Sequence, residues 1–383
     1  MFRKIIANGM PFCINPITGI ERVARDTLFA LDDIVQKGEI EIVFPRNAKN
    51  APKFKNISAV YLDKDFKSAS MWEQFDFQKY ALKSKGIPLD FCNTMPYFVP
   101  GIAYIHDIYS ELFPKQLKTF KKKVLSHYTC KIFRRIAKKA CKIVTVSEFS
   151  KQTIVDSYKI DSSRVAVIPN GISQMYVEAK ADDGVFEKFP QLKGKDFYFM
   201  LGALSHRKNL NWILRHSKLF PDELFAISGN ITNDNEEPYL QCLKNRKNVI
   251  LLGYLSDGQS KALMQKCKAF VFPSLFEGFG MPPLEALQSG AKIIISNATA
   301  LPQIYKGCAH YIDPKEPNVD LDELLEQPVE SPEKLLGALT ARRSAQRLYQ
   351  IIKEVWAEQN KTNILMTRVY IDFFILDGLL KLA

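Results

Sequence analysis

Short apolar runs alternate with amphipathic stretches along most of this 383-residue chain. In the second half, apolar runs predict strands at 197–203, 224–229, 249–254, 269–274, 291–296 and 309–313. Helical patterns such as "NLNWILRHSKLF" and "SDGQSKALMQKC" lie between them. The strand runs lack the alternation of a half-buried strand, so we expect a parallel sheet that is covered by helices on both faces.

The first half repeats this alternation. Strands are predicted at 4–8, 41–45, 59–63, 102–107, 142–147 and 164–170, and helices after Gly19, across 68–83, across 114–139 and after Ser147. The polar segment 173–196 has the composition of a linker. We therefore predict an α/β fold with two Rossmann-like, doubly wound domains, 1–172 and 197–340, followed by C-terminal helices over 341–383 that could pack back on the first domain. Ligands of such sheets bind at the carboxyl ends of the strands, so the cleft between the domains is the expected site.

Cysteine usage and the chain ends bear on the compartment. The seven cysteines are scattered and form no CxxC pair, which argues for a reducing compartment and against a disulfide framework or a zinc site. The N-terminal stretch lacks the continuous apolar region of a signal peptide. The apolar tail is too short to span a membrane and carries Asp372 and Asp377. We expect a cytoplasmic protein.

A net charge of +12 calls for an acidic partner, and the basic residues are unevenly distributed. Residues 115–142 hold eleven Lys or Arg and no Asp or Glu. Apolar positions recur there at three- and four-residue steps: Leu117, Phe120, Val124, Leu125, Tyr128, Ile132 and Ile136. The stripe predicts either an ordinary helix packed on the first domain or one that also rests on an anionic membrane surface. We expect no nucleic-acid partner, because no basic-aromatic platform accompanies the charge.

The segment "FMLGALSHRKNL" predicts a phosphate site. Its apolar strand ends at Gly202, and Arg207 and Lys208 follow where a helix should begin. Two cations beside helix N–H groups can bind a diphosphate, although a solvated basic turn has the same composition.

Two glutamates flank a glycine-rich turn in "FEGFGMPPLEALQSG". Glu277 follows a strand, and Pro282 and Pro283 suit the first turn of a helix, which would place Glu285 in that turn. A glutamate there can stabilise its own helix without any ligand. Alternatively, each carboxylate can accept hydrogen bonds from a pair of sugar hydroxyls.

Other candidate residues lie at predicted strand ends or helix starts. His106 ends the apolar strand of "AYIHDIY" and should face the cleft, where a structural hydrogen-bonding role is the alternative. Gly19 in "PITGIER" could admit a phosphate close to the backbone, or merely begin a helix. Two acidic pairs resemble a DxD metal motif, Asp63/Asp65 and Asp320/Asp322. Both lie in polar stretches away from strand ends, so we interpret them as surface acids. We expect no metal or cofactor.

Taken together, these segments resemble family 4 glycosyltransferases of the GT-B fold, which are retaining enzymes that use nucleotide sugars. The resemblance covers about residues 15–325 and rests on "TGIERVARDTL", "IHDI", "TVSEFSK", "RVAVIPNGI", "GALSHRKNL" and "FEGFGMPPLEAL". The first loop has one glycine where many relatives carry two. An aromatic segment that relatives usually show before the last helices is absent from "KLLGALTARRSAQRLYQIIKEV".

The resemblance implies a set of site residues. Substrate contacts are implied for Gly19, Gly202, Arg207, Lys208, Glu277, Gly278, Phe279, Gly280, Met281 and Glu285. Of these, Arg207 and Lys208 would bind the donor diphosphate, Glu277 the sugar hydroxyls and Glu285 the ribose. His106 would sit beside the transferred sugar on the acceptor side. Catalysis would rest on His106, Arg207, Lys208 and Glu277.

The resemblance also implies an activity. It predicts metal-independent, retaining transfer of a hexose, with mannose as the best expectation, from a nucleoside-diphosphate sugar to a saccharide acceptor. A lipid-linked acceptor in cell-surface polysaccharide synthesis would place the protein on the inner face of the cell membrane. The alternatives are a non-catalytic sugar-nucleotide-binding protein and a basic nucleic-acid-binding protein.

Overall fold

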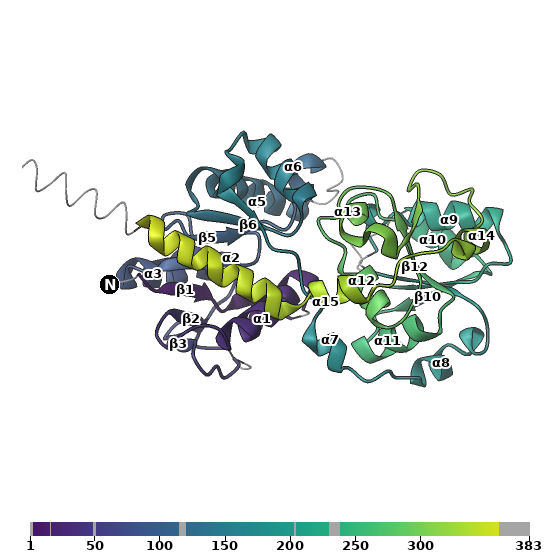
Figure 1. Cartoon of the computed structure of the whole chain (residues 1–383), viewed down its shortest axis with the longest axis horizontal. Helices are drawn as coiled ribbons and strands as arrows, with labels where there is room; N and C mark the ends of the chain where they lie inside the picture. Colours follow the sequence, from purple (N-terminus) through teal and green to yellow (C-terminus); the bar gives the residue numbers. More distant parts are fainter. Residues whose placement is uncertain are drawn as a thin grey trace, which may run out of the picture.

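The computed structural model describes residues 3–15, 17–48, 51–114, 120–202, 204–229 and 238–359. Figure 1 shows two lobes, each built around one sheet. The first sheet has the strand order β3-β2-β1-β4-β5-β6-β7 and the second β10-β9-β8-β11-β12-β13. The pairings within both sheets are parallel. The predicted fold class, with two Rossmann-like domains, is confirmed.

Every predicted strand overlaps a strand of the structure, and one strand was missed. The first sheet contains β1 (Ile5–Asn8), β2 (Ile40–Pro45), β3 (Ser58–Leu62), β4 (Ile87–Asp90), β5 (Ile102–Tyr104), β6 (Lys142–Thr145) and β7 (Val165–Val167). The second contains β8 (Tyr198–Leu201), β9 (Phe225–Ser228), β10 (Val249–Gly253), β11 (Ala269–Phe272), β12 (Ile293–Ser296) and β13 (His310–Ile312). The missed strand is β4, which lies between β1 and β5 although Pro88 cannot donate to the ladder.

The helices of the first domain follow the predicted order. They are α1 (Gly19–Asp32), α2 (Ala69–Trp72), the π-helical turn η2 (Glu73–Phe77), α3 (Gln78–Ser84), α4 (Tyr109–Leu112), α5 (Phe120–Lys139) and α6 (Glu148–Tyr158). Short 3-10 turns are η1 (Met10–Phe12) and η4 (Ser162–Arg164). The helix predicted over 114–139 is therefore α5, and residues 115–119 lie outside the described part of the chain.

The second domain begins within the segment that composition marks as a linker. Its helices are α7 (Gln174–Glu178), α8 (Gly184–Lys188), α9 (Leu210–Leu219), α10 (Pro238–Lys244), α11 (Asp257–Lys266), α12 (Met281–Gln288), α13 (Leu301–Tyr305), α14 (Leu321–Glu326) and α15 (Glu333–Ala338). Three 3-10 turns are η5 (Pro190–Leu192), η6 (His206–Lys208) and η7 (Lys306–Cys308). Within 173–196, Tyr176, Val185 and Leu192 are buried in the core of this domain. A few apolar anchors thus pack a segment whose overall composition is polar.

Strand β8 explains why these apolar runs lack alternation. Tyr198 and Met200 join the core on one face of the second sheet, whereas Phe199 joins the core on the other face. A strand that is buried on both faces needs apolar side chains at every position, as the parallel-sheet prediction required.

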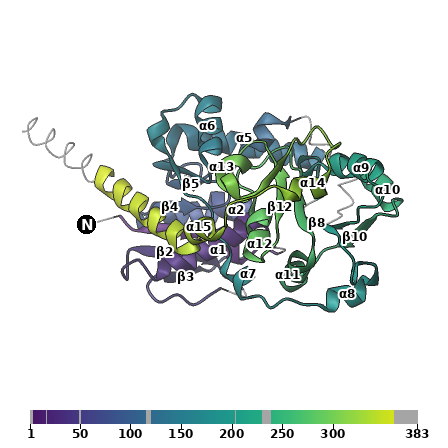
Figure 2. The same ribbon diagram turned by 45° about the vertical axis from the view of Figure 1, so that its right-hand side comes forward.

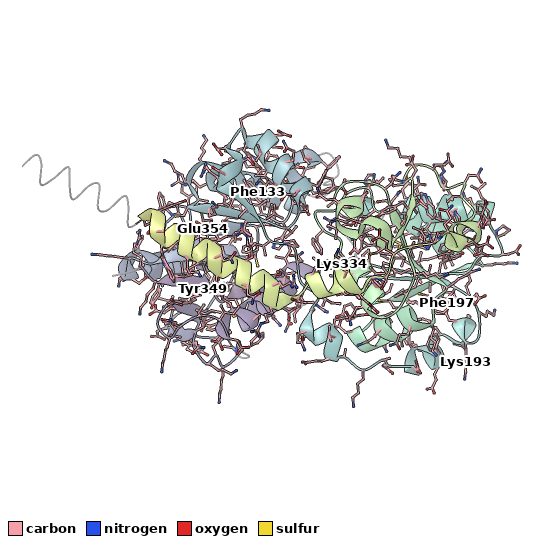
Figure 3. The ribbon with its side chains drawn as sticks, viewed as in Figure 1. Phe133, Lys193, Phe197, Lys334, Tyr349 and Glu354 are labelled. Carbon is pink, nitrogen blue, oxygen red and sulfur yellow. The ribbon has the colours of Figure 1, made fainter. Side chains whose placement is uncertain are left out.

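The chain returns to the first domain at its C-terminal side. A helix over residues 341–359 runs along that domain in both views (Figures 1 and 2). Its buried apolar side chains belong to the core of the first domain: Ala345, Leu348, Ile351, Ile352, Val355 and Trp356. Figure 3 shows Tyr349 and Glu354 on this helix, and the hydroxyl of Tyr349 donates to Glu39. The remainder of the predicted C-terminal helices, 360–383, lies outside the described residues.

Gly171 sits where the two passages between the domains touch. Ile172 forms an isolated bridge with Thr340. A Cβ added to Gly171 would lie 2.2 Å from the backbone nitrogen of Ala341. No larger residue fits between the crossing backbones, so packing requires the glycine of "IPNGI".

Candidate functional site

The basic turn after β8 places Lys208 deep in the second domain. The Lys208 side chain runs along the backbone of Gly202, where an added Cβ would lie 3.2 Å from the Lys208 Cε. Its Nζ donates to Oε1 of Glu277 at 2.7 Å and lies 4.2 Å from the ring centroid of Phe272. Lys208 and Glu277, which the sequence places in two separate motifs, thus form one buried ion pair.

The charges of this pair depend on each other. Burial alone would raise the pKa of Glu277, but Lys208 and Arg207 hold that pKa below its ordinary value. Burial lowers the pKa of Lys208 despite the attraction of Glu277. Each ion is therefore stabilised by its partner, because a lone buried charge would be strongly disfavoured.

Arg207 reaches across to the first domain. Its Nη1 donates to Oδ2 of Asp107 at 3.1 Å, and its guanidinium carbon lies 5.7 Å from the ring centroid of Tyr109. Attraction to Glu277, and then to Asp107, outweighs burial and raises the pKa of Arg207. The Arg207 side chain remains 29% exposed, so it can still meet a ligand. Asp107 was not predicted as a site residue, although it directly follows His106 in "IHDI".

Glu285 faces α1 of the first domain. Helix α12 begins at Met281, so Glu285 lies in its second turn rather than in the first turn predicted from the two prolines. Arg22 Nη1 lies 4.0 Å from Oε1 of Glu285. The same guanidinium makes two hydrogen bonds to Asp257, of 2.9 and 3.0 Å. Burial raises the pKa of Glu285 to about 7, although Arg22 opposes the shift.

The glycine turn between the glutamates is in direct contact with the first domain. The carbonyl of Gly278 accepts a hydrogen bond from the Ser147 hydroxyl at 2.7 Å. A Cβ added to Gly278 would lie 2.6 Å from the carbonyl oxygen of His106. Glycine is therefore required here by close approach of the two domains.

Phe276 strengthens this contact. Its ring is buried in a cluster with three aromatic rings of the first domain, each 5.6 Å away between centroids. These rings belong to Tyr109, Phe113 and Phe149. The described site is therefore a packed junction between the domains.

His106 follows β5, which ends at Tyr104, and its ring is buried. Its Nε2 lies 2.8 Å from the carbonyl oxygen of Phe91. A carbonyl can only accept, so Nε2 carries the proton and Nδ1 keeps its lone pair in the neutral ring. Burial lowers the pKa of His106, which favours this neutral form.

The remaining predicted contact residues are Gly19 of the first domain and a short run, 279–281, of the second. Gly19 is exposed at the start of α1, and an added Cβ would meet nothing within 4 Å. Phe279 packs its side chain into the core of the second domain. Gly280 and Met281 form the N-terminal end of α12. The structure thus brings Phe279, Gly280, Met281 and the two glutamates together around α12 of the second domain, whereas Gly19 lies on α1 of the first domain.

The DxD-like pairs have structural partners. Arg46 binds both Asp63 and Asp65 at the surface. Asp320 caps α14, and Asp322 accepts from Tyr198 and Lys268. Among the described residues, no cluster of three or more His, Cys, Asp or Glu side chains could hold a metal ion.

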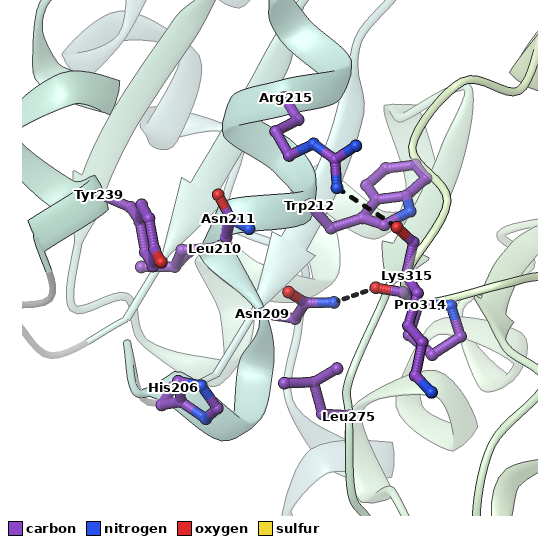
Figure 4. Close-up of a pocket in the computed structure, with 10 residues that line it drawn as sticks. All are labelled: His206, Asn209, Leu210, Asn211, Trp212, Arg215, Tyr239, Leu275, Pro314 and Lys315. Carbon is purple, nitrogen blue, oxygen red and sulfur yellow. Dashed lines mark hydrogen bonds between the residues drawn. The ribbon is translucent and has the colours of Figure 1, made fainter. Parts of the chain in front are cut away.

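A cavity of about 260 Å³ lies beside the basic turn, and His206 and Asn209 are among the residues that line it (Figure 4). Its polar groups hold the loop that follows β13. Asn209 donates to the carbonyl of Pro314 at 2.7 Å, and Arg215 donates to the carbonyl of Lys315 at 3.3 Å. We therefore interpret these contacts as support for the position of Arg207 and Lys208.

The chain is similar to known glycosyltransferases. The model "Glycosyl transferases group 1" matches residues 183–335, and "Glycosyltransferase Family 4" matches residues 87–174. The serotype-specific mannosyltransferase WbdA of Escherichia coli is 32% identical over 176 residues, which cover 42% of this chain and 21% of that protein. The O-antigen chain mannosyltransferase RfbU of Salmonella typhimurium is 28% identical over 229 residues, 58% of this chain and 60% of the relative. The matches thus span about one fifth and three fifths of these relatives.

Solved structures show the same fold. Sucrose-phosphate synthase from Thermosynechococcus elongatus superposes with a TM-score of 0.68 at 13% identity, covering 93% of this chain and all of the other. Two facing parallel sheets with a junction at their strand ends define a GT-B protein. Together the two family models match more than half of the residues, and the chain belongs to the family 4 glycosyltransferases.

Proposed function

We propose that this protein is a retaining glycosyltransferase that transfers a hexose from a nucleoside-diphosphate sugar to a saccharide acceptor. Mannose is the proposed sugar, because both relatives named above are mannosyltransferases. The name of one of them refers to an O-antigen chain, which supports a role in cell-surface polysaccharide synthesis. The observation that carries the proposal is the convergence of Arg207, Lys208 and Glu277 opposite His106 of the first domain.

The basic turn, His206–Lys208, would stabilise the leaving group. When the bond between the anomeric carbon and the diphosphate breaks, negative charge grows on the departing oxygen. Arg207 and the N-terminal end of α12 would stabilise this charge, since positioned cations and helix N–H groups act most strongly where charge develops. Lys208 would share this role while it remains bound to Glu277. We propose that these side-chain and backbone donors bind the diphosphate and that no metal is needed.

The remaining polar groups would position the sugar and the nucleotide. Glu277 would accept hydrogen bonds from sugar hydroxyls with its second oxygen, and Glu285 would accept from the ribose. His106 presents Nδ1 as an acceptor for a hydroxyl of the transferred sugar. The acceptor oxygen would then attack the anomeric carbon on the face from which the diphosphate leaves. Its proton would pass to the departing phosphate oxygen, which balances the reaction without a protein nucleophile.

We further propose a lipid-linked acceptor and reversible attachment to an anionic membrane face through α5. Ile132 and Ile136 of the predicted apolar stripe are buried, so the C-terminal half of α5 packs on the domain. Val124 and Leu125, nearer its start, are more than half exposed, and Lys123 beside them is exposed. Such a surface suits lipid headgroups. Among the described residues, no helix combines the length and apolarity of a membrane span.

Turnover separates transfer from mere binding. Thermal-shift screening against GDP-, UDP- and dTDP-sugars would select the donor, and released nucleoside diphosphate would then be measured with a panel of alkyl pyranosides as acceptors. We expect diphosphate release that depends on the acceptor, and NMR of the product should show the anomeric configuration of the donor. A donor that binds without release would indicate a non-catalytic sugar-nucleotide-binding protein, and an inverted product would contradict retention.

A further inference from the structure

The first domain contains a second cavity, of about 310 Å³, at the carboxyl ends of β1 and β4. Asn8 ends β1 and Asp90 ends β4, while Glu73 of η2 and Tyr128 of α5 approach from the covering helices. The described residues that line the cavity include no Lys, Arg or His, but they include Glu21, Glu73 and Asp90. An anionic ligand would find no counter-charge among these described residues, whereas hydroxyl groups could pair with their polar side chains.

Two buried carboxyl groups form the floor of this cavity. Asn8 Nδ2 donates to Oδ1 of Asp90 at 2.8 Å and lies 3.4 Å from Oε2 of Glu73. Thr94 donates to the other Glu73 oxygen at 2.6 Å. Asp90 is 1% exposed and Glu73 is 3% exposed. This network fixes both carboxyl groups but does not use all of their oxygens.

Two polar atoms of the cavity wall are left without a hydrogen-bond partner among the described residues. They are Oδ2 of Asp90 and the hydroxyl oxygen of Tyr128. Buried polar atoms are nearly always bonded, so an unpaired carboxyl oxygen and hydroxyl facing the same cavity point to a ligand that pairs with them.

Burial also changes the protonation of the carboxyl pair. It raises the pKa of Asp90 to about 7, and burial together with the charge of Asp90 raises the pKa of Glu73. Among the described residues, no cation lines the cavity to reverse these shifts. Both shifts favour the protonated form of each carboxyl group, and a carboxyl group that keeps its proton can donate to a hydroxyl group as well as accept from one.

The cavity shares a wall with the candidate transfer site. Phe91, whose carbonyl accepts from His106 Nε2, lines it. Asn93 lines it as well, and its side-chain oxygen accepts from the His106 backbone N–H at 2.8 Å. A ring bound in the cavity would thus lie behind the loop that positions His106, on the first-domain side of the junction.

We propose that this cavity binds one neutral pyranose ring of the saccharide acceptor. Asp90 Oδ2 and the Tyr128 hydroxyl would hydrogen-bond to ring hydroxyls, and Ile132 would pack against the apolar face of the ring. That the bound ring belongs to the acceptor rests on the proposed transferase function. The presence of a saccharide pocket can be tested without turnover.

The test is saturation-transfer NMR on the full chain without nucleotide. The probes are methyl α-pyranosides of mannose, glucose, galactose and N-acetylglucosamine, with the glucosamine analogue as a cationic probe. We expect saturation of at least one neutral pyranoside by the wild type, and at least a fivefold weaker signal with Asp90→Asn and with Tyr128→Phe. Both variants keep the size of the side chain. Tyr158→Phe is the matched control, because its hydroxyl is also buried but Tyr158 does not line this cavity.

The outcomes separate the pocket from the transferase function. Equal signals from wild type, Asp90→Asn and Tyr128→Phe, no signal from any pyranoside, or saturation of the glucosamine probe alone would each overturn the proposal. Donor-dependent release of nucleoside diphosphate is measured on the same wild-type sample. Release without pyranoside binding would leave the transferase function standing and remove the pocket. Pyranoside binding without release would support the pocket and remove the transferase function.

Discussion

Lys208 and Glu277 form an ion pair with a 2.7 Å contact, in which both side chains are at least nine-tenths buried. The lysine follows β8 and the glutamate follows β11, so the pair joins two neighbouring strand ends of the second sheet. Sequence motifs assign one residue to phosphate and the other to sugar. The structure adds that each is the counter-ion of the other.

Removing only one member of this pair should destabilise the fold. Lys208→Ala leaves the Glu277 charge buried and unpaired, and we expect a loss of about 3–5 kcal/mol in the free energy of unfolding. The double variant Lys208→Met with Glu277→Gln should recover most of that stability without recovering transfer. Urea unfolding of the three proteins measures the difference. A single variant as stable as wild type would show that the pair does not hold the fold.

Arg207 offers a cleaner test of the phosphate assignment because it is partly exposed. Loss of its charge-assisted contacts should weaken nucleoside-diphosphate binding by about 1.5–3 kcal/mol, or roughly 10- to 100-fold. Calorimetric titration of Arg207→Ala with the bare diphosphate measures this loss. Arg215→Ala is the control, since Arg215 lies on the same domain and donates to the carbonyl of Lys315 in the loop after β13. Equal affinities in both variants would remove Arg207 from the diphosphate site.

Nucleotide affinity should depend on pH through Glu285. The pKa of Glu285 is about 7, and we expect the ionised form to accept ribose hydroxyls, so affinity for the bare diphosphate should rise from pH 6 to pH 8. Ionisation of the phosphate itself affects every variant, and comparison with Glu285→Gln removes that contribution. Glu277→Gln should keep the rise and lose mainly sugar binding. An identical pH profile for wild type and Glu285→Gln would contradict the proposed hydrogen bonds from the ribose to Glu285.

The same pKa shift predicts a trend in stability. The folded protein retains a proton on Glu285 between about pH 4.5 and pH 7, where the unfolded chain has lost it. This group therefore makes the free energy of unfolding fall as pH rises through that window. In urea unfolding, Glu285→Gln should show a shallower fall of the free energy of unfolding with pH than the wild type. A steeper fall would contradict a raised pKa of Glu285 in the folded protein.

His106→Ala should lower kcat by about 100-fold or more while bare-diphosphate affinity changes less than about twofold. The reason is that His106 comes from the first domain and would meet only the sugar and acceptor. The variant also leaves the Phe91 carbonyl unpaired, which costs about 1–3 kcal/mol of stability and must be checked by thermal melting. Near-normal kcat in a folded variant would return His106 to a structural role.

Membrane attachment can be tested by sedimentation with vesicles. Substituting Gln at Lys123 and Lys131, both exposed on α5, should reduce recovery on anionic vesicles at low salt, because each basic residue near such a surface contributes about 1 kcal/mol. Lys193 and Lys195 are exposed on the second domain and provide the matched control. Equal binding to neutral vesicles, or equal loss in both pairs of variants, would leave α5 as ordinary scaffold.

The sequence by itself determined the elements and the chemistry of single motifs. The apolar runs are long enough to mark strands buried on both faces, and parallel strands place Gly202, Glu277 and His106 at strand ends. Those inferences need only local pattern. Strand β4 escaped because Pro88 argues against a central strand, and α7 and α8 escaped because Tyr176 and Val185 are few among polar neighbours.

Only the tertiary structure decided which charged groups meet. Arg207 and Asp107 are 100 residues apart, and Arg22 and Asp257 are 235 apart, so no local pattern links them. The Glu73–Asp90 pair depends on the π-helical turn packing over the end of β4. Burial then sets the protonation of these groups, because the cost of an isolated charge depends on every atom that replaces water around it. Local sequence specifies the side chains, and packing specifies their partners and charges.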